Sequence, residues 1–209
     1  MDYGKWRVDK WKQVAIEGSS KSPTIFLFRH AQTYYNKNKF FTGWRDSKLT
    51  PFGIGQAKKV AEKLKTKKFE VAIHTHLSRS IDTLNAVLKY HPECTRIFND
   101  DRMIERSYGD VSGSSHRAYE KRYGGEKLHI LRRDYNSRPP HGESMPMVEK
   151  RVFEFMDELL PWMKRNRVNV AISAHGNSMR PFRRRLEHLT IAQMMKLENP
   201  WDDYFAYEV

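Results

Sequence analysis

The feature that most constrains this fold is a short strand pattern that ends in an arginine and a histidine. Residues 24–28 read TIFLF, a run of β-branched and aromatic residues long enough for one buried strand. Arg29 and His30 follow it directly, and a second run, residues 168–174, leads in the same way into His175. Open α/β folds place their ligands at the carboxyl ends of such strands. The two strand ends therefore predict one site assembled from two distant parts of the chain.

Strand patterns alternate with helical patterns along the rest of the chain. Short strands are predicted at residues 69–73, 96–98 and 205–209, the last of them at a sheet edge. Helices are predicted from Thr50-Pro51 onward, and at residues 81–88, 144–163, 178–188 and 191–197. This alternation favours an α/β fold, specifically a three-layer α/β/α sandwich with a mainly parallel sheet.

Three segments need a separate interpretation. Residues 1–22 are predicted as a basic N-terminal extension to a domain of residues 23–209, with a tryptophan packed on the domain surface; a contact to membrane or nucleic acid is the alternative. Residues 103–143 have little apolar content and are predicted as one long functional insertion. The arginines of the 178–188 helix are predicted to form a solvated face: Arg180, Arg183, Arg184 and Arg185.

Length and charge limit the classes of protein that fit. The 209 residues suggest one domain, or one domain with an appendage, and the formal net charge of +13 favours anionic partners. The single cysteine, Cys94, allows no internal disulfide and predicts a reducing compartment, here the cytoplasm. No apolar run reaches about 18 residues, and the first residues show no apolar stretch typical of a secretory signal. We therefore expect neither a membrane span nor secretion.

A third strand end supplies another cation. Arg79 follows the 69–73 strand at the start of a helix, where backbone N–H groups also favour anions. His74 and His76 lie nearby, but no cysteine or carboxylate accompanies them at ligand spacing, so no metal is expected. Fixed cations without a metal motif suit a phosphoryl group. A neutral imidazole can attack phosphorus and carry the group as phosphohistidine, and a carboxylic acid is then needed to protonate the leaving oxygen.

Several motifs resemble those of one enzyme superfamily. The sequence RHAQT at residues 29–33, with Asn36, resembles the R-H-G-[EQ]-[ST]-x-x-N signature of the histidine phosphatase superfamily, and HGNS at 175–178 resembles its second-histidine motif. The segment LSRS at 77–80 is similar to the one that holds the family's second arginine. Segments 41–44, 105–109, 131–135 and 139–144 are similar to stretches of cofactor-dependent phosphoglycerate mutases. The resemblance runs from about residue 24 to Val209.

The resemblance implies a role for each matching residue. His30 would be the nucleophile and Glu105 the general acid and base. The transferring phosphoryl group would be bound by Arg29, Arg79 and His175, with Asn36 and Gly176, and the rest of the substrate by Thr42, Gly43, Tyr108, His116, Arg132, Arg133 and Asn177. A mutase of this kind needs 2,3-bisphosphoglycerate as primer and no metal. Its partner would be a small phosphorylated metabolite, rather than nucleic acid or a membrane, and the chain would be a monomer or a homodimer.

Three functions remain open on the sequence. The first is a phosphoglycerate mutase of glycolysis and gluconeogenesis, which interconverts 3- and 2-phosphoglycerate, and Arg132 and Arg133 favour it. The second is a phosphatase that hydrolyses small phosphate monoesters through the same intermediate. It is favoured by Ala31 in place of the usual glycine and by His116 in place of a lysine. It is also favoured by the end of the sequence at Val209, where mutases usually carry a further tail. The third is a basic protein that binds nucleic acid or an anionic surface.

Overall fold

A computed structural model describes residues 6–209 and contains one five-stranded sheet with the order β3-β2-β4-β1-β5. The strands are β1 (Thr24–Arg29), β2 (Val71–His74), β3 (Arg96–Asn99), β4 (Val170–Ala174) and β5 (Tyr204–Glu208). Strands β3, β2, β4 and β1 are parallel, and β5 pairs antiparallel with β1 at the edge. The predicted mainly parallel sheet is confirmed.

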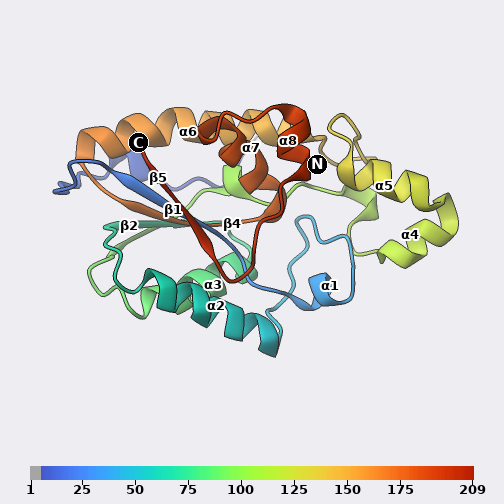
Figure 1. The fold of residues 1–209 in the computed structure, drawn as a ribbon, viewed down its shortest axis with the longest axis horizontal. Coiled ribbons are helices and arrows are strands. Elements are labelled where there is room, and N and C mark those ends of the chain that lie inside the picture. Colours follow the sequence, from blue (N-terminus) through green and yellow to red (C-terminus); the bar gives the residue numbers. More distant parts are fainter. Residues whose placement is uncertain (1–5) are drawn as a thin grey trace.

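Helices cover both faces of this sheet (Figure 1). One face carries α2 (Pro51–Leu64) and α3 (Ser78–Leu88), and the other carries α6 (Met145–Asn166), α7 (Gly176–Leu186) and α8 (Ile191–Lys196). The predicted three-layer α/β/α arrangement is therefore confirmed. None of the helices in residues 6–209 has both the length and the apolar character required to span a bilayer.

Alternate side chains of the central strands point to opposite faces of the sheet, so each strand contributes to both layers of the core. In β1, Ile25 and Leu27 pack with α6, whereas Phe26 and Phe28 pack with α2 and α3 on the opposite face. Both faces of a strand are buried in this arrangement, so the strand is a continuous apolar run and not an alternation. This explains why runs such as TIFLF identified the central strands from sequence alone.

The predicted insertion of residues 103–143 contains more regular structure than its composition indicated. The 3₁₀ turn η2 (Asp101–Met103) ends where this segment begins, and the segment itself contains the 3₁₀ turn η3 (Gly109–Val111) and the helices α4 (His116–Tyr123) and α5 (Gly125–Arg133). Only Leu131 is buried among the residues of α4 and α5. These helices therefore lack the apolar stripe by which a sequence reveals a helix. A further short helix, α1 (Tyr34–Lys37), follows His30.

The N-terminal segment packs more deeply than the predicted surface contact. Trp11, in the 3₁₀ turn η1 (Trp11–Gln13), is fully buried and lies against Phe155 and Trp162 of α6 at ring-centroid distances of 6.2 and 5.3 Å. Its indole N–H donates a hydrogen bond of 3.0 Å to the Asp100 carboxylate. Residues 6–22 thus contribute a side chain to the core, while residues 1–5 of the predicted extension lie outside the described residues.

Replacing Trp11 by alanine is expected to lower the free energy of unfolding by about 3–5 kcal/mol, because it empties a large buried volume. The midpoint of urea denaturation measures this change. Tyr90→Ala, at a side chain that is 50% exposed, is the matched control and should shift stability by less than about 0.5 kcal/mol. A loss below about 1 kcal/mol for Trp11→Ala would contradict the assignment of Trp11 to the core.

Candidate active site

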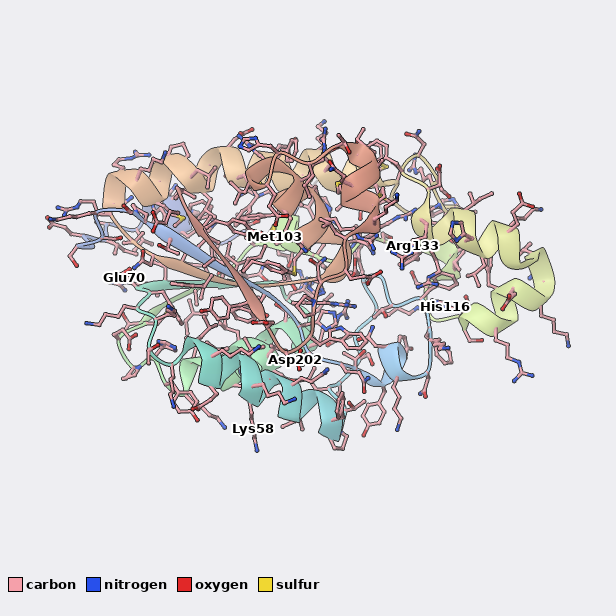
Figure 2. The ribbon with its side chains drawn as sticks, in the orientation of Figure 1. Lys58, Glu70, Met103, His116, Arg133 and Asp202 are labelled. Atoms are coloured by element: carbon pink, nitrogen blue, oxygen red, sulfur yellow. The ribbon has the colours of Figure 1, made fainter. Side chains whose placement is uncertain are left out.

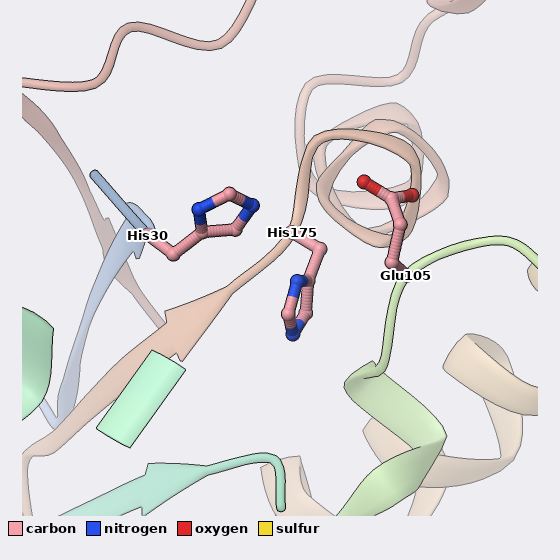
Figure 3. A group of neighbouring side chains, drawn as sticks. All are labelled: His30, Glu105 and His175. Atoms are coloured by element: carbon pink, nitrogen blue, oxygen red, sulfur yellow. The ribbon is translucent and has the colours of Figure 1, made fainter. Parts of the chain in front are cut away.

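Three titratable side chains from distant parts of the chain meet at the carboxyl edge of the sheet. Arg29 and Ala174 are paired in the register of β1 and β4, so the next residues, His30 and His175, emerge side by side. Their ring centroids are 5.0 Å apart. Glu105, which follows η2, joins them, and ligand-type atoms of all three side chains lie within 4.8 Å of one another (Figure 3). The structure therefore brings together the site predicted from two strand ends.

His30 is held in the tautomer that a nucleophile requires. Its Nδ1 lies 2.8 Å from the carbonyl oxygen of Ala31. Because a carbonyl can only accept, Nδ1 carries the hydrogen, and the lone pair is on Nε2. Burial lowers the pKa of His30 well below its usual value, and the charges of Arg79 and Arg29 lower it further. The imidazole is thus neutral at physiological pH.

His175 is buried in the same environment. Its Nε2 lies 2.8 Å from the Thr75 hydroxyl, and its Nδ1 has no partner among the described residues. Burial lowers the pKa of His175 well below its usual value, and Arg79 adds the largest charge effect. As the cap residue of α7, His175 also lies at the positive end of a helix. If the Thr75 hydroxyl donates to Nε2, the hydrogen of the neutral ring is on Nδ1. That N–H can donate a hydrogen bond to an incoming oxyanion, although the ring carries no charge.

Two arginines supply the positive charge, Arg79 fully buried and Arg29 partly buried. Arg79 donates to the carbonyl oxygens of Gly43 and Arg45 at 2.8 and 2.9 Å, and Arg29 donates to that of Asn199 at 3.2 Å. Burial lowers the pKa of each guanidinium to about 10, which leaves both charged at neutral pH. The Nε of each arginine has no partner among residues 6–209. Both groups therefore retain a donor for a further acceptor such as a phosphoryl oxygen.

The positive charge of Arg29 and Arg79 decides whether His30, Glu105 and His175 suit a metal ion or an anion. His30, Glu105 and His175 offer one ligand atom each, a set that could by distance alone hold a metal ion. However, the cations of Arg29 and Arg79 lie close enough to both histidines to lower their pKa values, after burial. A metal cation would meet this repulsion, whereas an anion would be attracted. The electrostatics favour a phosphoryl group at this position.

Glu105 is fixed at both its carboxylate and its backbone. One carboxylate oxygen accepts hydrogen bonds from the backbone N–H groups of Arg106 and Asn177, at 2.8 and 3.1 Å. The backbone carbonyl accepts from the indole N–H of Trp44 at 2.7 Å and from the Arg151 guanidinium at 3.1 Å. The second carboxylate oxygen makes none of these bonds. This side chain can thus present a carboxyl oxygen to a leaving group beside His30.

A cleft with a volume of about 160 Å³ opens beside the two histidines, and Arg29 and Glu105 lie on its lining. Every residue predicted to bind the substrate lies on its lining: Asn36, Thr42, Gly43, Tyr108, His116, Arg132, Arg133, Gly176 and Asn177. His116 and Arg133 lie at the base of the α4–α5 hairpin, on the side toward the sheet (Figure 2). The tertiary structure thus gathers residues from five segments around one cleft, although the role of each in binding stays a prediction.

Within this lining, two of the predicted residues also shape the backbone. The Asn36 side-chain oxygen accepts from the Thr33 N–H at 3.1 Å and thereby caps α1. Gly43 has φ +52°, and a Cβ at this position would lie 3.1 Å from the backbone nitrogen of Tyr108. Glycine is thus required here both for the left-handed conformation and for the close approach of the 105–109 segment.

The structure also shows the surroundings of the two residues that differ from the family pattern, Ala31 and His116. Ala31 is fully buried, its N–H donates to the Thr83 hydroxyl at 3.0 Å, and its φ is not positive, so its methyl group is accommodated beside the nucleophile. His116 lies 4.4 Å from Phe41 between ring centroids. Burial, followed by the charges of Arg132 and Lys39, lowers the pKa of His116 to about 4. His116 is therefore a neutral residue of the cleft.

Sequence reasoning missed part of the site. The prediction of a solvated face was wrong for Arg180 and Arg183, which are only 8% and 9% exposed. Arg180 lines the cleft and donates to the carbonyl oxygen of Leu197, because the segment after α8 folds back over α7. Its spacing of four residues from Gly176 places both on one helix face and could have indicated this. Glu198 and Asn199 also line the cleft, and no sequence signal marked them.

Comparison with known proteins agrees with this geometry. The family description "Histidine phosphatase superfamily (branch 1)" matches residues 25–203. A 2,3-bisphosphoglycerate-dependent phosphoglycerate mutase of Parvibaculum lavamentivorans is 35% identical over 189 residues, which cover 88% of this chain and 90% of the relative. A mutase of the same name from Mesorhizobium japonicum is 36% identical over 181 residues, covering 85% and 87% of the two chains.

A solved structure shares the fold. A mycobacterial glucosyl-3-phosphoglycerate phosphatase has a TM-score of 0.73 at 24% identity, with 89% of this chain and 90% of the other covered. At this identity the likeness concerns the fold alone. The family match and the sequence relatives both cover most of the chain. The resemblance in the motifs around His30 and His175 is thus confirmed, and this chain belongs to the histidine phosphatase superfamily, branch 1, as an enzyme of that superfamily.

Proposed function

We propose that this enzyme is a 2,3-bisphosphoglycerate-dependent phosphoglycerate mutase, which interconverts 3- and 2-phosphoglycerate through a phosphohistidine at His30. The observation that supports it best is a second group of cations on the cleft that opens beside His30: Arg132, Arg133 and Arg180. A phosphate monoester with no other charge would need only Arg29 and Arg79. A substrate with a second anionic group, such as the carboxylate of phosphoglycerate, uses both groups of cations.

The site residues can perform the transfer as follows. The lone pair on Nε2 of His30 attacks the phosphorus atom, and the bond from phosphorus to the ester oxygen breaks. The carboxylic acid of Glu105 gives its proton to the departing oxygen, which leaves as an alcohol. Arg29, Arg79 and His175 stabilise the charge on the phosphoryl oxygens during the transfer. In the reverse direction, the Glu105 carboxylate takes the proton from an incoming hydroxyl group.

The cleft also suits the primer that this activity requires. In such a mutase, 2,3-bisphosphoglycerate supplies the phosphoryl group that first charges the histidine. Its two phosphates match the two cationic groups of the cleft, with Arg29 and Arg79 at His30 and Arg132, Arg133 and Arg180 for the distal phosphate. The residues present therefore fit a bisphosphate.

A phosphatase acting on small phosphate monoesters is the second candidate. Two observations favour it: the neutral His116 adds no charge to the distal group, and Glu198 brings a carboxylate to it. The Oε1 atom of Glu198 lies 2.9 Å from the Arg133 guanidinium. Both features weaken the hold on a bound bisphosphate. A phosphoryl group on His30 would then be transferred to water instead of to a second hydroxyl group.

Phosphorus NMR of 3-phosphoglycerate, recorded with and without catalytic 2,3-bisphosphoglycerate, separates the two activities. Formation of 2-phosphoglycerate that depends on the primer and on His30 would support the mutase. Inorganic phosphate as the sole product would replace it by the phosphatase. If neither 3-phosphoglycerate nor p-nitrophenyl phosphate changes in a His30-dependent way, both proposals fail.

Replacing Glu198 by glutamine is expected to improve binding of doubly anionic substrates. The variant removes a negative charge beside Arg133, and an exposed pair of this kind is worth about 0.2–1 kcal/mol. The KM for 3-phosphoglycerate should therefore fall by up to about fivefold, and less at high salt, with kcat little changed. The KM for p-nitrophenyl phosphate, which has one anionic group, should not change.

The matched control is Glu126→Gln, on the exposed surface of α5 and outside the cleft lining. It removes the same charge from the protein without altering the cleft. An equal effect of the two variants on 3-phosphoglycerate would show that only the net charge matters.

A further inference from the structure

The N-terminal segment reaches the loop that carries Glu105. Trp6 lies outside the residues matched by the family, which begin at residue 25. Its ring meets Trp44 edge to face, with centroids 5.7 Å apart, and the Arg151 guanidinium lies 5.1 Å from its ring centroid. Both geometries are favourable contacts of an aromatic ring. Trp6 therefore joins two side chains that come from distant segments of the chain, Trp44 between α1 and α2 and Arg151 in α6.

Both of these side chains bind the same atom. The indole N–H of Trp44 and the guanidinium of Arg151 donate to the backbone carbonyl of Glu105, at 2.7 and 3.1 Å. Arg151 is itself fixed by the buried Glu143 carboxylate, at 2.9 Å, and by the carbonyl oxygen of Arg102, at 2.7 Å. Trp6 thus packs on the two donors that determine where the backbone of Glu105 lies.

The residues after Trp6 anchor the segment next to the same loop. Val8 forms an antiparallel bridge with Asp100, and the Asp101 N–H donates to the Arg7 carbonyl at 3.0 Å. The buried Trp11 then binds Asp100. The N-terminal segment therefore holds the chain directly before Glu105 as well as the donors to Glu105 itself.

We propose that Trp6 is a positioning residue for the general acid, keeping the Glu105 carboxyl in place through Trp44 and Arg151. The inference rests on the phosphohistidine chemistry proposed above, in which Glu105 protonates the leaving oxygen. Its physical basis is that proton transfer needs the donor within hydrogen-bond reach of the acceptor, so a small displacement of the Glu105 backbone reduces the rate.

The leaving group distinguishes this role from general destabilisation. In the mutase reaction, the alkoxide of the phosphoglycerate that departs from the bisphosphate is a poor leaving group and needs the proton from Glu105. By contrast, p-nitrophenolate is a stabilised anion that can leave without one. A displaced Glu105 therefore slows the first reaction and spares the release of p-nitrophenolate in the first turnover, before water removes the phosphoryl group. A loss of folded protein lowers both equally.

The test compares Trp6→Ala, Trp6→Phe and Trp44→Phe with the wild-type enzyme on 3-phosphoglycerate, with primer present, and on p-nitrophenyl phosphate. For Trp6→Ala and Trp44→Phe, kcat for conversion of 3-phosphoglycerate to 2-phosphoglycerate should fall by about tenfold, with KM unchanged. The release of p-nitrophenolate in the first turnover should stay within about twofold of the wild-type rate. Trp6→Phe keeps an aromatic ring against Trp44 and Arg151 and should restore most of the rate. Thermal unfolding of each variant measures the folded fraction.

Ile16→Ala is the matched control, because it alters the same segment at a side chain packed against the core and removes none of the contacts described for Trp44, Arg151 and Asp100. It should lower the unfolding temperature and leave the ratio of the two rates unchanged. Equal losses on both substrates in Trp6→Ala, or no loss on either, would overturn the inference while leaving the proposed function intact. An absence of His30-dependent turnover in the wild-type enzyme would overturn the function, and the inference with it.

Discussion

Replacing His30 by alanine is expected to abolish phosphoryl transfer, with a loss of at least about 10⁴-fold in kcat. The physical reason is that the proposed reaction passes through a covalent bond to Nε2 of His30. His175 lies beside His30, but its Nε2 is bound to the Thr75 hydroxyl, and it is positioned at the end of β4 instead of β1. Transfer should therefore not move to the second histidine.

The measurement is the capture of the phosphoenzyme from labelled phosphate ester after a rapid quench. Phosphohistidine is labile in acid and stable in alkali, which distinguishes it from a phosphoserine. Label should appear in the wild-type enzyme and be absent from His30→Ala, while unfolding shows that the variant is folded. His129→Ala, at an exposed position of α5, is the control and should retain full labelling. Persistent acid-labile label in His30→Ala would assign the nucleophile to another residue.

Removing Arg79 is expected to produce the second largest loss, about 10²–10³-fold in kcat/KM for Arg79→Ala. This guanidinium is fully buried, and its charge is the largest charge effect on both histidines after burial. It also binds the carbonyl oxygens of Gly43 and Arg45, and so fixes the loop that lines the cleft. Arg79→Lys should give an intermediate loss, because a lysine keeps the charge but not the planar fork.

The same substitution has a consequence for pH dependence. Arg79 disfavours the protonated form of His30 and so lowers its pKa; removing the cation must raise that pKa toward the usual value. More of His30 is then protonated at mildly acidic pH, and a protonated imidazole has no lone pair for attack. The loss in Arg79→Ala should therefore be greater near pH 5 than near pH 8.

Rates across this pH range, together with NMR titration of the imidazole signals, test the expectation. Arg96→Ala, at an exposed position of β3, is the control for the loss of one positive charge. It should leave both the rate and the histidine titration unchanged. Parallel pH profiles for the wild-type enzyme and Arg79→Ala would contradict the assigned influence of Arg79 on His30.

The central strands and the chemistry at their ends could be predicted from sequence because both are local. A strand buried on both faces must be a continuous apolar run, as in TIFLF. The residues that follow such a run necessarily emerge at the sheet edge, so Arg29-His30 and His175 could be placed together without coordinates. The predicted cluster of His30, His175 and Glu105 exists in the structure, while their catalytic roles stay predictions tested by the experiments above.

The elements that sequence reasoning missed depend on contacts made elsewhere. Helices α4 and α5 bury one side chain between them, so no apolar periodicity marks them. Arg180 looked like one of four surface arginines, and only the return of the segment after α8 buries it in the cleft. Trp11 looked like a surface tryptophan, and only its contacts with Phe155 and Trp162 of α6 make it a core residue.

The sequence by itself thus determined the layered α/β architecture, the pair of strand-end histidines and the anionic nature of their ligand, because these follow from apolar periodicity and side-chain chemistry within short segments. The tertiary structure alone decided which charges surround the distal part of the cleft, and that the N-terminal segment supports the donors to Glu105. The physical reason is that these features arise from contacts such as those of Trp6 with Trp44 and Arg151 and of Glu198 with Arg133, which join residues 38 or more positions apart in the chain.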